Sequence, residues 1–376
     1  MTILLTDESY LKQALKLAAK AKGRTSPNPM VGALVVKNDK IVGKGFHPVA
    51  GKPHAEIYAL REAGEQARKA TIYVTLEPCN HQGRTPPCTE AIIAAGISRV
   101  VIGMEDPNPK VAGKGIARLR KAGIDTVSGI LEDKCRQLNE AYIKYITTNT
   151  PFVTLKIAAS MDGRIATHAG HSHWITNDKS RRYVHRLRDE TDAILIGIGT
   201  LLQDNPMLTT RLSEKKSRNP YRIIVDSRLR TPLHANIFGK DAKEKLILAT
   251  SCKNQENLKL YKDRTYHILQ IPTDEVGQLD LKILMKKLAQ LEIMSVLIEG
   301  GSEISGSSVD AGIVDKLCFF YAPLLIGGRG SIGMMGGQGI NFMPEAQRVK
   351  NLKIKHFGTD ICVEGYLQSP PSPPHE

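Results

Sequence analysis

Three potential metal ligands and one carboxylate stand out in the first hundred residues of this 376-residue chain. They are His54, Cys79 and Cys88, with Glu56 two residues beyond the histidine. One histidine and two cysteines can hold a zinc ion and leave a fourth position for water, which distinguishes a catalytic zinc site from a closed structural one. Zinc lowers the pKa of such a water, and Glu56 could carry its protons. The residue types therefore predict one zinc ion per chain and hydrolytic chemistry.

The surrounding sequence predicts elements that would bring these residues together. A helix is expected from His54 to about Ala63, a buried strand over 71–76 leads to Cys79, and a second helix follows Cys88. The ligands would then gather near helix N-termini, whose positive dipole ends favour thiolates. A lone histidine or cysteine pair is usually structural, but this combined pattern is far less probable by accident. The remaining cysteines are too scattered to complete a four-cysteine zinc knuckle: Cys135, Cys252, Cys318 and Cys362.

Composition bounds the class of protein. Hydrophobic residues make up 41% of the chain, which is enough for two folded cores, and no stretch approaches the length of a membrane span. The N-terminus does not resemble a signal peptide, and six dispersed cysteines do not resemble a secreted disulfide framework, so we expect a cytoplasmic protein. The net charge of +14 is spread along the chain without basic blocks interleaved with aromatics. Nucleic acid is therefore not expected as a partner, whereas a small anionic substrate is.

Alternating strands and helices run through both halves of the chain. The first half begins with a predicted hairpin around Asn38-Asp39 and ends with one predicted helix from Glu132 to Ile146. The polar stretch 147–151 ends in proline and marks the predicted boundary between domains. Short apolar runs in the second half predict further buried strands: 153–158, 193–198, 221–225, 245–248, 296–298 and 317–321. The domains are expected at 1–147 and 151–367, and the proline-rich tail 368–376 is expected to be disordered.

The second half carries turns suited to a phosphorylated ligand. A strand ends in the glycine pair Gly300-Gly301, where backbone amides could approach a pyrophosphate at a helix start. Arg211, in the loop that follows Asp204, supplies a guanidinium that can bind a phosphate through paired donors. There is no G-x-G-x-x-G fingerprint followed by an acidic ribose ligand, so a classical dinucleotide-binding fold is not supported.

The first half has the H-x-E and P-C pattern of zinc nucleobase deaminases, with a distinctive change. Eight residues, 80–87, separate the two cysteines, whereas two are usual, and this loop carries His81 and Arg84. The segment 28–108 resembles the deaminase part of the RibD family, the bifunctional enzymes of riboflavin biosynthesis. The resemblance extends over the second half and covers nearly the whole chain except the tail.

That resemblance implies an α/β fold in two parts, with a cytidine-deaminase-like α/β/α domain followed by a dihydrofolate-reductase-like α/β domain. It implies zinc on His54, Cys79 and Cys88, with Glu56 as the catalytic proton carrier. The first reaction would be zinc-dependent hydrolytic deamination of 2,5-diamino-6-(5-phosphoribosylamino)pyrimidin-4(3H)-one to 5-amino-6-(5-phosphoribosylamino)uracil. The implied contacts to this substrate are Asn28, His47, His81, Arg84, Asp106 and Asn108.

For the second domain the resemblance implies an NADPH-dependent reductase that converts the ribosyl group into ribityl. Hydride chemistry belongs to the nicotinamide, so the protein would mainly orient cofactor and substrate. The implied cofactor contacts are Ala158, Trp174, Thr200, Asp204, Ser227, Gly301, Ser302, Glu303, Ile304, Ser305, Gly306 and Ser307. The implied contacts to the phosphorylated substrate are Ser172, Arg188, Leu208, Arg211 and Glu299. We expect a homo-oligomer.

Three other interpretations compete with a bifunctional enzyme. A zinc deaminase of tRNA or nucleosides with an unrelated second domain would share the zinc motif, but it would not explain the long loop between Cys79 and Cys88. A non-enzymatic zinc-stabilised module would not explain Glu56. An enzyme with one decayed half is disfavoured because both sets of motifs are intact.

Overall fold

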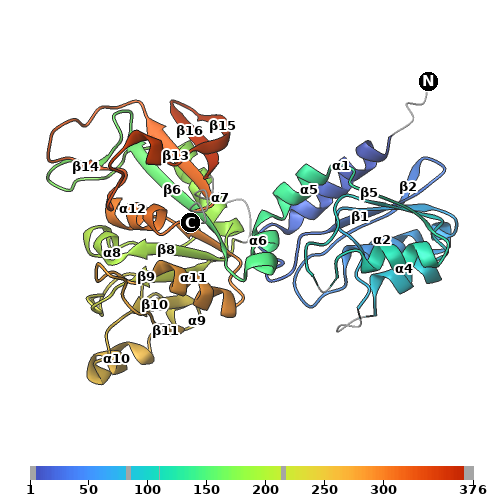
Figure 1. The fold of residues 1–376 in the computed structure, drawn as a ribbon, viewed down its shortest axis with the longest axis horizontal. Coiled ribbons are helices and arrows are strands. Elements are labelled where there is room, and N and C mark those ends of the chain that lie inside the picture. Colours follow the sequence, from blue (N-terminus) through green and yellow to red (C-terminus); the bar gives the residue numbers. More distant parts are fainter. Residues whose placement is uncertain (1–5, 82–85, 110, 213–216, 368–376) are drawn as a thin grey trace, which may run out of the picture. The chain divides into compact units, whose positions relative to one another are not determined.

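The computed structural model describes residues 6–81, 86–109, 111–212 and 217–367. The chain divides into two compact units, 1–150 and 151–376, and each has its own sheets and cores (Figure 1). The predicted disordered tail, 368–376, lies outside the described residues. Among the described residues, no helix is both long and apolar enough to cross a membrane.

The first unit is built on a five-stranded sheet. Its order is β2-β1-β3-β4-β5, antiparallel around β1 and parallel from β3 to β5. The strands are β1 (Gly32–Lys37), β2 (Lys40–Phe46), β3 (Thr71–Val74), β4 (Arg99–Ile102) and β5 (Asp125–Ser128). The helices are α1 (Asp7–Ala18), η1 (Ala19–Ala21), α2 (Ala55–Ala63), η2 (Gly64–Ala67), α3 (Cys88–Ala94), α4 (Lys114–Lys121), α5 (Glu132–Leu138) and α6 (Glu140–Thr148). The predicted hairpin at Asn38-Asp39 is confirmed as β1 and β2.

Helices cover both faces of this sheet because its strands alternate between two cores. Ala33 and Val35 of β1 pack in one core with apolar residues of α2, α3 and α4. Leu34 and Val36 point to the opposite face and pack against α1. The result is an α/β/α sandwich, and the zinc-ligand candidates lie at the ends of elements around the α2 and α3 layer.

The expected single helix over 132–146 is wrong, because it is two helices, α5 and α6, interrupted at Asn139. Asn139 leaves helical geometry, with φ −105° and ψ 22°. Its side-chain oxygen accepts from the Met30 amide at 2.8 Å, and its amide group donates to the Met30 carbonyl at 3.0 Å. A tertiary contact over more than a hundred residues therefore sets the break, and helical periodicity does not record it.

The second unit is built on a nine-stranded sheet. Its order is β11-β10-β9-β8-β12-β6-β13-β16-β15, parallel as far as β13 and antiparallel for the last two strands. The strands are β6 (Phe152–Ser160), β8 (Ala193–Gly197), β9 (Tyr221–Val225), β10 (Leu246–Thr250), β11 (His267–Gln270), β12 (Ser295–Ile298), β13 (Lys316–Ala322), β15 (Val349–Phe357) and β16 (Asp360–Leu367). A separate pair joins β7 (Arg164–Ala166) to β14 (Ile332–Gly333).

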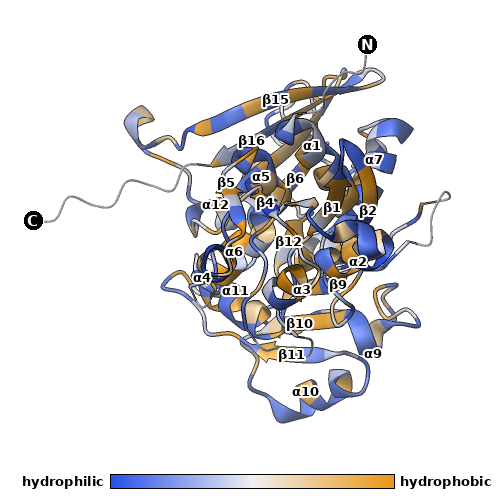
Figure 2. Cartoon of the chain, turned by 90° about the vertical axis from the view of Figure 1, so that its right-hand side faces the viewer, coloured by the Kyte–Doolittle hydropathy of each residue, from blue (hydrophilic) through white to orange (hydrophobic). Residues whose placement is uncertain are grey.

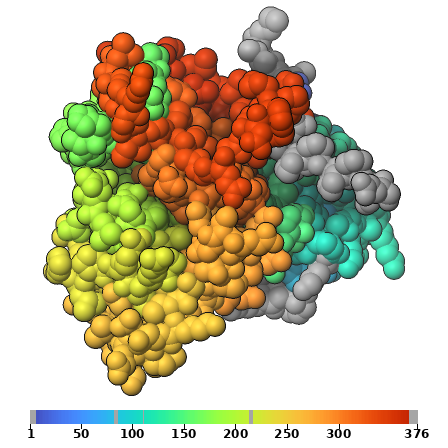
Figure 3. Space-filling view, turned by 60° about the vertical axis from the view of Figure 1, so that its left-hand side comes forward, coloured from blue at the N-terminus to red at the C-terminus, as the bar shows by residue number. Residues whose placement is uncertain are grey.

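Helices lie over both faces of this sheet as well. They are α7 (Asp178–Glu190), α8 (Ile198–Asp204), α9 (Ala242–Lys245), α10 (Gln255–Lys262), α11 (Leu281–Gln290), α12 (Ser302–Asp310) and the short η3 (Met343–Glu345). Inner strands such as β10 are hydrophobic, whereas outer helices such as α7 are largely hydrophilic (Figure 2). The loop after β13 reaches back to β7, and Figure 3 shows its orange-red atoms beside green atoms of the segment around β7.

Candidate active sites

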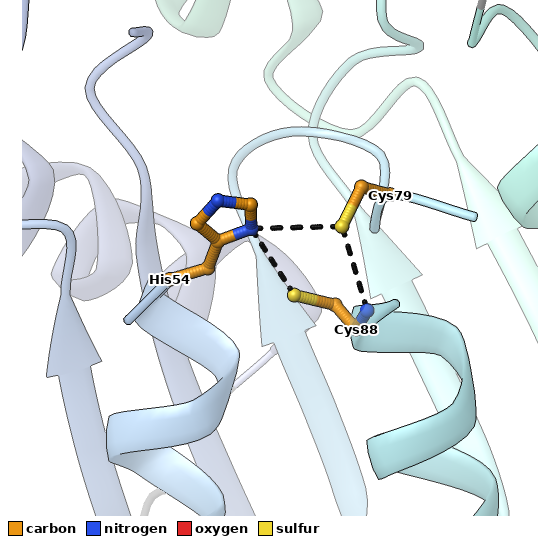
Figure 4. A group of neighbouring side chains, drawn as sticks. All are labelled: His54, Cys79 and Cys88. Carbon is orange, nitrogen blue, oxygen red and sulfur yellow. Dashed lines mark hydrogen bonds between the residues drawn. The ribbon is translucent and has the colours of Figure 1, made fainter. Parts of the chain in front are cut away.

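The three predicted zinc ligands converge in the first unit (Figure 4). His54 Nδ1 lies 3.5 Å from Cys79 Sγ and 3.3 Å from Cys88 Sγ. Donors around a tetrahedral zinc, with Zn–N near 2.1 Å and Zn–S near 2.3 Å, are separated by about 3.6 Å. The distances in the chain therefore fit one zinc ion held by these three side chains.

Local structure explains why the ligands meet. His54 is the N-cap of α2, and Cys88 is the first residue of α3. Cys79 follows β3 in a loop, where its sulfur accepts a hydrogen bond from the Cys88 backbone amide at 3.4 Å. The N-terminus of α3 thus faces the Cys79 sulfur, and its dipole favours the thiolate form that binds metal.

The pKa values of the two neighbouring thiols are shifted in opposite directions. Hydrogen bonding from the Cys88 thiol, opposed by burial and helped by His54, lowers the pKa of Cys79 below the ordinary thiol range. The same hydrogen bond, together with burial, raises the pKa of Cys88. On a bound cation both would be thiolates.

Glu56 lies next to the ligand cluster in the first turn of α2. Its side chain is buried, with 3% exposed, and among the described residues its Oε2 has no hydrogen-bond partner. Burial raises the pKa of Glu56 to about 7, although the neighbouring His54 opposes this rise. A buried carboxyl group that has one oxygen without a hydrogen-bond partner and a pKa near neutrality can both take and give a proton.

Asn28 and His47 lie together beside this cluster. The Asn28 amide nitrogen is 3.1 Å from His47 Nε2, and His47 Nδ1 is 3.1 Å from the Pro53 carbonyl oxygen. The His47 ring meets the His54 ring edge-on, with centroids 5.5 Å apart. His47 is only 2% exposed and has partners at both ring nitrogens, so in this state it orients Asn28.

The other predicted deaminase contacts lie on two loops. Asp106 accepts hydrogen bonds from the Asn108 amide at 2.9 Å and from the Tyr142 hydroxyl at 3.1 Å. Burial raises the pKa of Asp106, and the nearby charge of His81 lowers it. Asp106 and His81 are thus close enough to interact electrostatically, whereas Arg84 lies outside the described residues.

The second unit contains a cavity of about 720 Å³. It is bordered by β6, the end of β8, the turn after β12, helix α7 and the loop 170–176. Most of the residues predicted for the reductase line it: Ala158, Ser172, Trp174, Arg188, Thr200, Asp204, Leu208, Arg211, Glu299, Gly301, Ser302, Glu303 and Ile304. The remaining predicted residues are not among the residues that line it: Ser227, Ser305, Gly306 and Ser307.

The glycine turn at one side of the cavity fits a phosphate-bearing cofactor. A Cβ on Gly300 would come within 1.8 Å of Ile304 Cγ2, so any larger residue there would have to displace the Ile304 side chain. Gly301 is the N-cap of α12 and offers no side chain to cap it, while its own amide donates to Thr200 Oγ1 at 2.9 Å. The following amides at the start of α12 can therefore face a pyrophosphate of NADPH. Gly306 has a different role, because it packs against the backbone of Gly336.

A buried group of charges lies on the other side of the cavity. Arg188 donates to both carboxylate oxygens of Glu299, at 2.7 and 3.0 Å, and to the Thr209 carbonyl at 3.1 Å. Lys156 Nζ is 3.9 Å from Glu299, and burial lowers the pKa of this lysine. Sequence reasoning missed Lys156, although a lysine inside an apolar strand was a signal. The pairing also means that Arg188 holds Glu299, which leaves Arg211 with the exposed side chain.

Trp174 has 69% of its surface exposed, so it is not the core residue that a single tryptophan usually is. The Arg181 guanidinium lies 4.6 Å from the centre of its ring, and both residues line the cavity. Ser172 Oγ is 3.4 Å from Asp204 Oδ1 across the same opening. An aromatic face at the mouth of a cavity suits a planar ring of a cofactor or substrate.

Comparison with known proteins finds a matching family model for each of the two units. The cytidine and deoxycytidylate deaminase zinc-binding region matches residues 5–104, and the RibD C-terminal domain matches residues 151–363. The second match excludes a nucleoside deaminase joined to an unrelated domain. The riboflavin biosynthesis protein RibD of Aquifex aeolicus is 44% identical over 95% of this chain and 97% of its own length. The riboflavin biosynthesis protein RibD of Escherichia coli is 43% identical over 96% of this chain and 99% of its own length.

Solved structures give the same result over nearly the full length. RibD of Acinetobacter baumannii superposes with a TM-score of 0.87 at 38% identity, covering 96% of this chain and 99% of that one. A Thermotoga maritima protein described as a diaminohydroxyphosphoribosylaminopyrimidine deaminase and 5-amino-6-(5-phosphoribosylamino)uracil reductase gives 0.84 at 38% identity with the same coverage. One unit brings together three potential zinc ligands and the other contains a cavity of about 720 Å³, and with these relatives the chain belongs to the RibD family of bifunctional deaminase–reductases.

Proposed function

We propose that this chain catalyses two successive steps of riboflavin biosynthesis. The first unit would deaminate 2,5-diamino-6-(5-phosphoribosylamino)pyrimidin-4(3H)-one by zinc-dependent hydrolysis, giving 5-amino-6-(5-phosphoribosylamino)uracil. The second would then use NADPH to reduce the ribosyl group to ribityl. We assign these activities to residues 1–147 and 151–367. The observation that carries the proposal is the convergence of His54, Cys79 and Cys88 beside the buried, unpartnered oxygen of Glu56.

In the deaminase site the protein's main chemical task is proton transfer. His54, Cys79 and Cys88 would hold a zinc ion, which when bound would lower the pKa of water and so make hydroxide available near neutral pH. The Glu56 carboxylate takes the proton released from water and gives it to the pyrimidine ring nitrogen. Once the water oxygen has bonded to C2, Glu56 would carry the second proton to the C2 amine, so that the C–N bond breaks, ammonia leaves and a carbonyl forms at C2.

The remaining residues of that site would hold the pyrimidine and its phosphate. Asn28, oriented by His47, is suited to the polar edge of the ring. Asp106 and Asn108 come from the loop after β4 and would contact the substrate from another side. His81 and Arg84 belong to the long loop between the cysteines, and we assign the phosphate to them.

In the reductase site the protein would bind and orient two ligands. NADPH bound there would supply the hydride for C1 of the ribosyl group in its open-chain form. The Gly301 turn would hold the pyrophosphate, while Ala158, Trp174 and Thr200 would contact the cofactor from the cavity wall. Asp204 and Ser227 complete the proposed cofactor set. The substrate would lie against Ser172, Leu208, Arg188, Arg211 and Glu299, with Arg211 binding its phosphate.

We further propose that the protein forms a homo-oligomer in the cytoplasm. Strand β15 is an edge of the large sheet and carries the exposed side chains Leu352 and Ile354, so it could pair with a second copy. Phe342 and Met343, just before this strand, are also exposed. All six cysteines are free thiols, which suits a reducing compartment.

Mass spectrometry of the products tests the proposed activities directly. Purified, zinc-loaded enzyme is incubated with the diaminopyrimidine phosphate, with and without NADPH. Exchange of an amine for oxygen in both samples, followed by addition of two hydrogens only with NADPH, is the expected result. Exchange without reduction would reject the assignment of the second unit. No change in either sample, with zinc content verified, would reject the deaminase.

A further inference from the structure

Glu77 is a buried carboxylate two residues before Cys79, and the mechanism above does not use it. Its side chain is 3% exposed. Oε1 accepts hydrogen bonds from the amides of Gly115 at 2.8 Å and Ile116 at 3.1 Å. Oε2 accepts from the amides of Asp106 at 3.2 Å and Gly113 at 3.0 Å. One side chain therefore satisfies four backbone donors that come from a distant part of the chain.

These four donors lie at the two ends of a single loop. Asp106 begins the segment that carries both proposed substrate contacts, Asp106 and Asn108, and Gly113 ends it. Gly115 and Ile116 are in the first turn of α4, whose N-cap, Gly113, has no side chain to cap it. Glu77 supplies the missing acceptor from outside the helix, where a negative charge is favoured by the helix dipole.

The packing around Glu77 is tight enough to fix this arrangement. A Cβ on Gly115 would lie 2.1 Å from the Pro78 carbonyl oxygen and 3.1 Å from Glu77 Oε1. The Glu77 amide also donates to the Met104 carbonyl at 3.0 Å, at the start of the same loop. Glu77 is therefore held, through both its backbone and its side chain, against Met104 and Asp106 at one end of the loop and against the start of α4 at the other.

We infer that Glu77 is a positioning residue of the deaminase, which sets the loop bearing Asp106 and Asn108 at a fixed distance from the zinc ligand Cys79. This inference rests on the proposed deaminase function. Glu77 does not touch the reacting atoms. It acts through the loop. If Asp106 or Asn108 moved by about 1 Å, the substrate would no longer be held in the geometry that the reaction needs.

Three variants separate this role from a general loss of structure. Glu77→Gln keeps the length of the side chain, but its amide nitrogen cannot accept, so two of the four amides lose their partner. Glu77→Asp keeps the charge but is too short to reach both ends of the loop together. Glu90→Gln is the matched control, because Glu90 also contacts α4, through an exposed ion pair with Arg118 at 2.7 Å.

The measurements are deaminase KM and kcat, zinc per chain, and hydrogen–deuterium exchange of the peptide spanning 105–113. We expect Glu77→Gln to raise the KM for the diaminopyrimidine phosphate by about tenfold or more, with a smaller change in kcat. Zinc should stay at one per chain, exchange of the loop should become faster, and reductase kinetics should not change. Glu77→Asp should show a smaller shift of KM in the same direction, and Glu90→Gln should match the wild type.

Other results would overturn either the positioning role of Glu77 or the proposed deaminase function. An unchanged KM in Glu77→Gln, with faster loop exchange or without it, overturns the positioning role. Loss of zinc in both Glu77→Gln and Glu77→Asp also overturns it, because Glu77 would then serve the metal site as a whole. If wild-type enzyme with bound zinc does not deaminate the substrate, the proposed function fails, and the exchange data alone still report whether Glu77 holds the loop.

Discussion

At the scale of single residues, Glu56 carries the most specific prediction. Glu56→Gln keeps the size of the side chain but removes the group that takes and gives protons. Deamination should therefore fall by about a hundredfold or more, the usual contribution of a general acid–base group. Zinc content and reductase activity should not change, since the three ligands and the second unit are untouched. Substantial deamination by a zinc-loaded variant would remove Glu56 from the role of proton carrier.

His185 predicts a pH dependence of stability in the second unit. Burial, followed by the charges of Arg188 and Arg211, lowers the pKa of His185 from 6.5 to about 4. Its Nδ1 accepts from the Arg211 amide at 3.3 Å, which requires the neutral ring. Between these two values the unfolded chain binds a proton that the folded chain does not. The contribution of neutral His185 to the free energy of unfolding is thus complete above pH 6.5 and is lost as the pH falls toward 4.

The size of this loss of stability depends on how far the pKa of His185 is lowered and on how much solvent screens its charge. A shift of this kind corresponds to at most about 3 kcal/mol, and partial exposure of His185 reduces it to about 1 kcal/mol. Denaturant unfolding of the second unit near neutral pH and near pH 4.5 should show that His185→Gln loses less stability on acidification than the wild type. Equal losses in the two proteins would show that His185 titrates normally in the folded state.

At the scale of elements, the break between α5 and α6 predicts a measurable cost of removing Asn139. Asn139→Ala would leave the amide and the carbonyl of Met30 without partners, at roughly 1–3 kcal/mol of unfolding free energy in the first unit. Asn139→Asp still accepts from the Met30 amide, but it places a buried carboxylate oxygen against the Met30 carbonyl and should therefore lose at least as much. Urea unfolding followed by a probe in the first unit measures both losses. Equal stability of Asn139→Ala and the wild type would mean that α5 and α6 are separated for another reason.

Sequence patterns predict a strand well when its side chains are buried and poorly when they are exposed. The predicted bounds of strand β9, 221–225, are the observed ones, because Ile223, Ile224 and Val225 form a short apolar run of the kind that parallel sheets bury. Strand β15 was missed, because most of its side chains are exposed and many are lysines. It exists through its pairing with β16, which no local pattern records.

The same limit applies to the sites. Spacing revealed His54, Cys79, Cys88 and Glu56, because the zinc motif is local in sequence. Pairs such as Arg188 with Glu299 join residues more than a hundred positions apart, and only the fold brings them together. For that reason the predicted list contained both members of this pair but could not show that they neutralise each other.

At the scale of the whole molecule, each site is supported by cores of its own unit. The cores of the first unit draw only on residues before 144, and those of the second unit only on residues after 152. Damage to one site should therefore leave the other folded and active. The central claim is that the chain holds two chemically distinct active sites, of which one alone depends on zinc.

Removal of zinc tests this claim most directly. The enzyme is treated with a chelator, freed of excess chelator, and given either the diaminopyrimidine phosphate or 5-amino-6-(5-phosphoribosylamino)uracil together with NADPH. We predict that the zinc-free enzyme does not deaminate the first compound but reduces the second at the wild-type rate, and that added zinc restores deamination. Deamination without zinc, or loss of reduction when zinc is removed, would contradict the account.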